Sequence, residues 1–431
     1  MKFLEEKFVP LAAKIGSQKH LLAIRDGFVV VMPCTIAGAI AVLLNNFHGV
    51  FGENGLNMVG IQEGWKTVLT TTGLGQICSY VEAGTINVLT ILVLAMIAYN
   101  VAKANDGDPK ATSVVALASY LAPATIIAGE TGNGLDVSVL KATGLFVGMI
   151  CALIIGEVFP RLSKMKALKI TMPDGVPPAV ANAFSSLLPA MITIFAWVAL
   201  CNIIQSLSGD SIWVLINNIV GAPLTSVSQS VFTVVLIYFM IDFLWIFGLH
   251  GANVVGSITT PVLTPLSLEN VSLYASGQEP KYTVVGELQS GFAFLGGSGA
   301  TIGLIVAIFI FSKSKAARTV VSISVAPGIF EINEPLTFGL PIVMNVIYAI
   351  PFILGPIIMG VITYFLMESG IIRRPCIQAP WVTPPILIGF LCTGGDIKGA
   401  IWNAIEIVLL TILWTPFVMM SDKVEAKEAA E

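Results

Sequence analysis

Long apolar segments recur along the whole chain, and each approaches the ~20 residues that a helix needs to cross the hydrocarbon core of a membrane. Only 11% of the 431 residues are charged and 55% are hydrophobic, whereas a soluble domain carries roughly 25% charged residues. So few charges cannot cover a water-facing surface of this size. The sequence therefore predicts an all-α integral membrane protein with about ten transmembrane helices, and it excludes a soluble enzyme. The segments lie at residues 28–44, 84–101, 111–127, 140–159, 183–204, 231–248, 292–311, 346–367 and 400–420.

The charge balance and the reactive side chains exclude several further classes of protein. The 22 Lys and Arg residues against 26 Asp and Glu residues give a net charge of -4, so no basic field is present to bind nucleic acid. The 6 Cys residues lack CxxC spacing and lie mostly in apolar segments, which is typical of buried small hydrophobic residues. No HExxH or Walker A motif is present. We therefore expect no cofactor and no metal site.

Basic residues near the two ends of the chain predict its orientation in the membrane. Residues 1–20 have the spacing of an amphipathic helix that lies on a lipid surface, with Leu4, Phe8 and Leu11 on one face. The first apolar segment follows Lys19 and Arg25. Further basic residues, among them Lys423 and Lys427, follow the last segment. The positive-inside rule then places both termini in the cytoplasm.

Three apolar stretches contain too much Gly, Pro and Thr to be predicted as plain helices. They lie at residues 250–266, 326–340 and 379–395, all after residue 205. Irregular backbone persists at membrane depth only where protein or a water-filled cavity satisfies its polar groups, and such breaks are where transporters build binding sites. We therefore expect re-entrant hairpins in the C-terminal half. The prediction is a helical scaffold over residues 1–205 and a substrate-binding, transporting domain over residues 206–431.

The most informative stretch places Glu331, Asn333 and Glu334 among apolar residues. A charged side chain at the bilayer centre costs ~2.5–3.5 kcal/mol on insertion scales, so it usually faces a cavity or a partner. Two carboxylates and an amide within four positions could bind the hydroxyls of an uncharged polar ligand. The alternative is a solvated loop at the membrane surface.

Other candidate residues lie in three further stretches. Trp245, His250 and Asn253 surround a helix-breaking Gly, which suits an aromatic face beside polar groups, although a lone His is often hydrogen-bonded core. The run that contains Gly297 and Ser298 offers either anion-binding N–H groups or close helix packing. Trp381 is either a second aromatic platform or an interfacial residue. The dispersed acids, which are either proton-relay groups or helix-end partners, are Asp242, Glu287, Asp396 and Glu406.

Four stretches of this sequence resemble the membrane subunit, enzyme IIC, of bacterial phosphotransferase sugar-uptake systems. The resemblance is to the lactose/cellobiose family, in particular cellobiose or diacetylchitobiose permeases, and it covers nearly the whole chain. The longest stretch, GIFEINEPLTFGLPIVMN, is the most specific. The matching stretches are Phe247–Val255, Gly296–Gly303, Gly328–Asn345 and Met172–Val180.

This resemblance implies a homodimer in the bacterial cell membrane whose N-terminal helices form the interface. It implies that His250 and Glu334 contact the sugar hydroxyl that receives phosphate, and that Glu331, Asn333 and Trp245 line the same pocket. A cysteine of a separate IIB protein would supply the phosphoryl group. Glu334 is the expected general base, because burial can raise a carboxyl pKa toward neutrality.

Two rival functions fit parts of the sequence. A proton-coupled secondary transporter, which releases unmodified sugar, would also use buried acids. An enzyme that acts on lipid-linked sugars would need basic residues near its pocket, and the sequence offers no such cluster there. The sequence does not distinguish cellobiose from diacetylchitobiose or lactose as the transported disaccharide.

Overall fold

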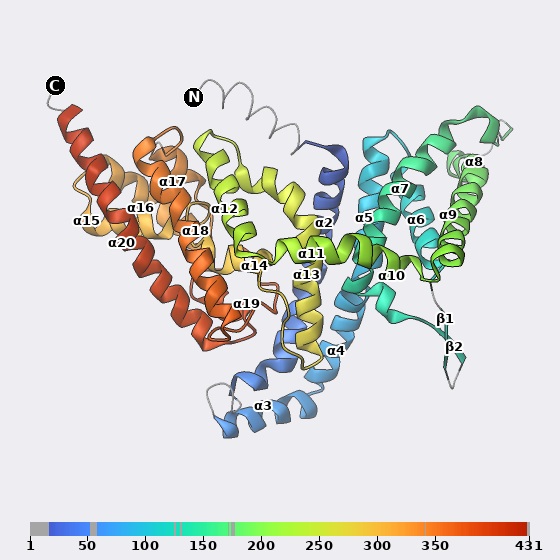
Figure 1. Ribbon diagram of the computed structural model, residues 1–431, viewed down its shortest axis with the longest axis horizontal. Coiled ribbons are helices and arrows are strands. Elements are labelled where there is room, and N and C mark those ends of the chain that lie inside the picture. Colours follow the sequence, from blue (N-terminus) through green and yellow to red (C-terminus); the bar gives the residue numbers. More distant parts are fainter. Residues whose placement is uncertain are drawn as a thin grey trace. The chain divides into compact units, whose positions relative to one another are not determined.

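The computed structural model describes residues 17–51, 58–124, 126–129, 132–170, 172–173, 177–340 and 342–428 (Figure 1). Most of the amphipathic helix predicted over residues 1–20, and residues 174–176 of the fourth matching stretch, lie outside these ranges. The described residues are mainly helical, with one hairpin of two short antiparallel strands, β1 (Ile126–Gly129) and β2 (Gly132–Leu135). The predicted all-α class is confirmed.

Six helical segments in the described part of the chain are long and apolar enough to cross a membrane. The helices Ile212–Ser228 and Val231–Ile246, which meet at a 78° bend, pass the same test together. The prediction of about ten crossings is not tested by these lengths. The six segments are Lys19–Gly49, Leu74–Ala104, Ala142–Lys164, Leu187–Ser208, Val346–Glu368 and Ile397–Lys427.

The chain forms two compact units, of which the smaller comprises residues 17–37 and 83–226. Its helix α5 packs against both α6 and α7. Close approach depends on small residues, since a Cβ added to Gly148 or Gly156 would lie 2.7 Å from Thr90 or Val101. The main helices of this unit are α5 (Leu89–Ala104), α6 (Pro109–Leu121), α7 (Leu145–Lys164), α8 (Pro178–Ser185), α9 (Leu187–Ser208), α10 (Ile212–Ile216) and α11 (Ala222–Ser228).

The larger unit comprises residues 38–82 and 227–431 and contains the candidate site. Helix α12 packs against α13 and α18, while α15 packs against α16 and α20. Its core includes the fully buried side chains of Phe292, Phe352 and Trp414. Its helices are α3 (Val59–Thr71), α12 (Val231–Ile246), α13 (Gly251–Ala275), α14 (Gly286–Leu288), η8 (Gln289–Ala293), α15 (Ile302–Phe311), α16 (Lys315–Ile329), α17 (Glu334–Gly339), α18 (Val346–Glu368), α19 (Leu387–Cys392) and α20 (Ile397–Glu428). Helix α2 (Lys19–Asn46) contributes residues to both units, as do α4 (Leu74–Thr85) and the end of α11.

In two stretches the secondary structure differs from the one predicted. The stretch 250–266, expected to be irregular, lies almost wholly within helix α13 despite Pro261 and Pro265. A proline removes only one helical hydrogen bond, and membrane helices tolerate it where neighbouring groups compensate. Conversely, the apolar stretch 292–311 is not one helix: it contains the end of η8 and all of α15, which are separated because Gly296, Gly297 and Gly299 adopt positive φ angles.

Candidate functional site

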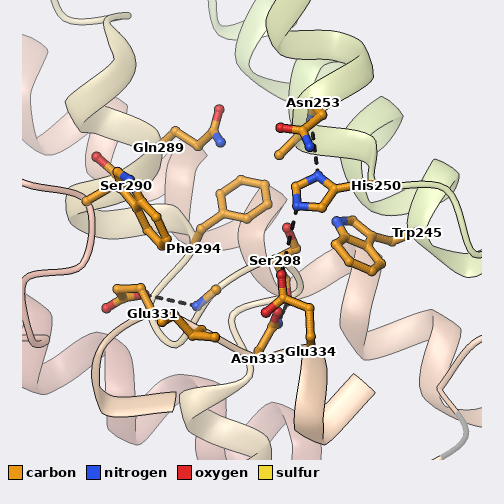
Figure 2. A pocket seen from close by; sticks show the side chains of 14 residues that line it. Trp245, His250, Asn253, Gln289, Ser290, Phe294, Ser298, Glu331, Asn333 and Glu334 are labelled. Atoms are coloured by element: carbon orange, nitrogen blue, oxygen red, sulfur yellow. Dashed lines mark hydrogen bonds and ion pairs between the residues drawn. The ribbon is translucent and has the colours of Figure 1, made fainter. Parts of the chain in front are cut away.

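A pocket of about 350 Å³ in the larger unit gathers every residue that the sequence predicted to contact the ligand, although none of the four dispersed acids lines it. The predicted residues come from stretches as far apart as α12 and the segment before α19, yet all line the same cavity (Figure 2). None of the 14 described lining residues is Lys or Arg. The predicted residues are Trp245, His250, Asn253, Gly297, Ser298, Glu331, Asn333, Glu334 and Trp381; the others are Ala252, Gln289, Ser290, Phe294 and Ile332.

His250 occupies the position before the first turn of α13 and uses its two ring nitrogens differently. Its Nδ1 accepts a hydrogen bond of 3.2 Å from the backbone N–H of Asn253, so the side chain caps the helix. A ring nitrogen that accepts carries no proton, and the neutral imidazole then carries its proton on Nε2. That nitrogen lies 3.9 Å from Oε1 of Glu334. The helix cap therefore orients the donor toward the carboxylate.

Glu334 begins α17, directly after the break that separates it from α16, and Pro335 follows it in the first helical turn. The side chains of Glu334 and His250 are 45% and 43% exposed, so both can be reached from the cavity. The distance of 3.9 Å between His250 Nε2 and Glu334 Oε1 is too long for a direct hydrogen bond. A hydroxyl oxygen could lie about 2.8 Å from both atoms at once. The pair can therefore hold one hydroxyl between a donor and an acceptor.

The two tryptophans of the pocket differ in accessibility. The Trp245 ring packs 4.8 Å from the His250 ring and 6.2 Å from Phe338, measured between centroids. Trp245 is only 4% exposed, so it mainly supports His250, whereas Trp381 is 50% exposed. Trp381 is thus the more open aromatic surface for a sugar ring.

Two buried carboxylates hold the glycine loop 296–299. Oε2 of Glu331 accepts from the N–H groups of Gly296 and Gly297 at 2.5 and 2.9 Å, and Oδ1 of Asp242 accepts from Gly299 at 3.0 Å. The N–H groups of the three glycines, which could otherwise bind an anion, are therefore occupied by side chains of the protein itself. Glu331 adopts φ +66°, which is uncommon for a residue with a side chain.

Asn333, in the short segment between α16 and α17, also supports this loop. Its side-chain amide donates to the carbonyl of Ser298 at 2.6 Å and to the hydroxyl of Thr301 at 3.2 Å. Asn333 is 4% exposed, compared with 7% for Glu331. These two residues face the cavity but engage mainly the loop, whereas His250 and Glu334 are open to a ligand.

The other dispersed acids lie outside the pocket lining and have local partners. Asp396 accepts from the backbone N–H groups of Arg373 and Lys398, as expected of a helix-end residue. Glu287 accepts from Ser267 at 2.8 Å, and Glu406 accepts from Thr363 at 2.8 Å. In the described part of the chain, none of these three acids lines the pocket.

Gln289, Ser290 and Phe294 line the pocket from the turn before the glycine loop, although none of them is among the predicted site residues. Figure 2 shows Gln289 and Ser290 on the side of the cavity away from Trp245. The signal available was a Gln-Ser pair within an otherwise apolar stretch, directly before a Gly. Gln289 begins η8, a turn of π-helix, and such turns occur frequently at functional sites.

Known proteins match this chain over nearly its whole length. The family model described as "Phosphotransferase system, EIIC" matches residues 25–356. The lichenan permease IIC component of Bacillus subtilis (strain 168) is 32% identical, covering 99% of this chain and 94% of its own. The cellobiose-specific EIIC component of Lactococcus lactis subsp. lactis (strain IL1403) is 31% identical, covering 99% and 98%.

A solved structure shares the fold. The transporter ChbC, the IIC component from the N,N'-diacetylchitobiose-specific phosphotransferase system, matches with a TM-score of 0.89 at 31% identity, covering 99% of each chain. A sugar transporter that works by proton coupling alone is not favoured by these matches. The chain therefore belongs to the EIIC family of phosphotransferase systems and is a sugar-specific membrane permease component that acts with a separate IIB protein.

Proposed function

We propose that this permease imports a neutral disaccharide of the cellobiose or diacetylchitobiose type and presents it for phosphorylation at the His250–Glu334 pair. The names of the relatives support the substrate class, since they refer to lichenan, cellobiose, oligo-beta-mannosides and diacetylchitobiose. A cavity of about 350 Å³ without Lys or Arg in its described lining suits an uncharged polar ligand.

The observation that carries the proposed chemistry is the 3.9 Å separation of the His250 Nε2 and Glu334 Oε1 atoms. A sugar hydroxyl between them accepts from Nε2–H and donates its proton toward Oε1. Its oxygen attacks the phosphorus atom of the IIB phosphocysteine. An O–P bond forms, the S–P bond breaks, Glu334 takes the hydroxyl proton, and the thiolate remains on IIB. His250 orients the hydroxyl by donating to it.

The remaining pocket residues would bind rather than react. Trp381 offers an exposed ring face, and Asn253 and Ser298 offer polar groups to sugar hydroxyls. Glu331, Asn333 and Gly297 would shape the cavity through the glycine loop.

The proposal also covers how the chain assembles and how it is oriented in the membrane. The chain would form a homodimer through helices of residues 1–205, embedded in lipid with both termini in the cytoplasm, while residues 206–431 move the sugar. The exposure of large apolar side chains such as Phe195 at 72% and Phe232 at 70% suits contact with lipid or with a second copy.

The test is sugar phosphorylation by the purified permease in lipid vesicles, with phosphorylated IIB as donor. Glu334→Gln preserves the side-chain shape but cannot accept the proton, so we expect disaccharide binding to persist and phosphorylation to fall by about 100-fold or more. Glu279→Gln, at a position 84% exposed and outside the pocket lining, is the matched control and should keep full activity. Near-normal phosphorylation by Glu334→Gln would refute the role of base.

A further inference from the structure

The buried amide of Asn403, on helix α20, uses all four of its hydrogen-bonding positions. Its Oδ1 accepts from the backbone N–H groups of Ile386 at 3.1 Å and Gly389 at 3.0 Å. Its Nδ2 donates to the carbonyl of Gly291 at 3.0 Å and to Oε2 of Glu406 at 2.8 Å. Asn403 is fully buried, so water cannot replace any of these partners. One side chain thus joins three separate segments.

Two of those segments carry walls of the pocket. Gly291 lies in the π-helical turn η8, whose residues Gln289 and Ser290 line the cavity. Ile386 and Gly389 lie at the start of α19, the helix that follows Trp381 in the chain. Asn403 itself does not line the pocket. Its influence on a ligand must therefore pass through these walls.

The amide is anchored on two long helices. Glu406, one turn along α20, accepts a hydrogen bond of 2.8 Å from the hydroxyl of Thr363 on α18. The indole N–H of Trp402 donates to the same hydroxyl at 2.7 Å. Buried networks whose members are all satisfied are rigid, because every alternative arrangement leaves a polar group without a partner. The turn η8 is therefore fixed relative to α18 and α20.

Gln289 is the side chain whose placement depends most directly on this turn. Within the described part of the chain, its amide has no hydrogen-bond partner, although it faces the cavity. Figure 2 shows it on the side of the pocket away from Trp245. A free amide at that place can bind sugar hydroxyls that do not react, while the reacting hydroxyl lies between His250 and Glu334.

We propose that Asn403 is a positioning residue for sugar recognition, which holds η8 so that the Gln289 amide meets the disaccharide. This inference rests on the proposed function of the pocket. Loss of the Asn403–Gly291 bond lets the turn relax and moves Gln289, while the His250–Glu334 pair keeps its geometry. The effect therefore falls on KM for the disaccharide and not on kcat.

The experiment is a double-mutant cycle on the phosphorylation assay in vesicles, with cellobiose and diacetylchitobiose as substrates. Asn403→Asp keeps the acceptor atom for Ile386 and Gly389 but loses the donors to Gly291 and to Glu406, and its carboxyl group must share a proton with that of Glu406. We expect it, like Gln289→Ala, to raise KM about 3- to 10-fold with kcat changed less than about 2-fold, the range of one lost hydrogen bond. The double variant should show no larger KM than Gln289→Ala alone, because Asn403 acts through Gln289.

Asn270 provides a matched control. It is also a fully buried asparagine with four hydrogen bonds, to Lys281 N–H, to both backbone groups of Tyr282 and to the Pro375 carbonyl. None of these residues lines the pocket. Asn270→Asp should therefore lower thermal stability without changing KM, which separates positioning from a general structural effect.

The outcomes distinguish this inference from the proposed function. If Glu334→Gln abolishes phosphorylation but the Asn403 and Gln289 effects on KM multiply, the function stands and the inference is overturned. An unchanged KM in Gln289→Ala overturns it as well. If Asn403→Asp does not fold, Gly291→Ala perturbs the same turn, since its Cβ would lie 2.9 Å from Sγ of Cys392. If Gly291→Ala raises KM in the parent chain but not in a chain that already carries Gln289→Ala, the inference is supported. If Gly291→Ala leaves KM unchanged in the parent chain, the inference is overturned.

Discussion

The two nitrogens of His250 perform separable tasks, and substitutions can remove them one at a time. Nδ1 caps α13 by accepting from the Asn253 N–H, and Nε2 faces Glu334. The carbonyl of an asparagine at this position lies near the place of Nδ1, so His250→Asn keeps the cap but loses the group that faces Glu334. His250→Ala loses both.

The expected losses of stability and of affinity follow from the Nδ1 contact and the Nε2 contact, respectively. Loss of a helix-capping side chain costs about 1 kcal/mol, which corresponds to about 2–4 °C in the midpoint of thermal unfolding for a unit of this size. Loss of one hydrogen bond to the sugar costs about 0.5–1.5 kcal/mol, or about a 2- to 13-fold weaker affinity. His250→Asn should therefore weaken binding with almost unchanged stability, whereas His250→Ala should show both losses.

The assays are disaccharide binding by calorimetry and thermal unfolding in detergent, made on the parent and both variants. We expect the two variants to lose affinity equally and only the alanine variant to lose stability. An asparagine variant that binds disaccharide as tightly as the parent would show that Nε2 does not contact the sugar. Equal unfolding midpoints for the asparagine and alanine variants would show that Nδ1 does not stabilise the helix.

The remaining predictions concern the glycine loop and the assembly. Gly297→Ala places a Cβ 2.7 Å from Asn333 and 2.8 Å from the Glu331 carbonyl, at φ +93°, so sugar binding should fall by about 5-fold or more, the factor that corresponds to a strain of about 1–3 kcal/mol. Gly286→Ala, with no atom within 4 Å of the new Cβ, is its control, and intact binding by Gly297→Ala would contradict the prediction. For the proposed homodimer, single cysteines at exposed apolar positions of residues 1–205, such as Ile77 and Val114, should cross-link in membranes. Cross-links formed only from positions after residue 205, such as Ile412, would contradict that interface.

The sequence indicated the fold class and the candidate site well, because both depend on residues that are costly at membrane depth. Glu331, Asn333 and Glu334 stood out as polar groups in an apolar stretch, and the structure places them on one pocket with Trp245 and His250. That they bind sugar stays a prediction. Gln289 gave a weaker signal, because an uncharged amide costs less to bury than a carboxylate and carries no motif.

Local composition was a poorer guide to helix limits. Residues 250–266 read as irregular because of their Pro and Thr content, yet they lie almost wholly within α13, where hydroxyls such as that of Ser257 bond back to carbonyls of the preceding turn. The role of Asp242 could not be found from spacing either. Its partner, Gly299, lies 57 positions away in the chain, and such pairings depend on tertiary packing.

The absence of Lys and Arg from the described lining of the pocket has a consequence for the direction of transport. An uncharged disaccharide meets no electrostatic penalty there, but its phosphorylated form carries a charge of about -2 near neutral pH. Once Glu334 has released the proton that it took from the hydroxyl, its carboxylate repels the sugar phosphate. Each unit of like charge at about 4 Å is unfavourable by about 1 kcal/mol in bulk water and by about 4 kcal/mol at a partly buried site. We therefore expect the cavity to release the sugar once it is phosphorylated and not to bind it again. Phosphorylation would then also prevent the permease from exporting the sugar that it has imported.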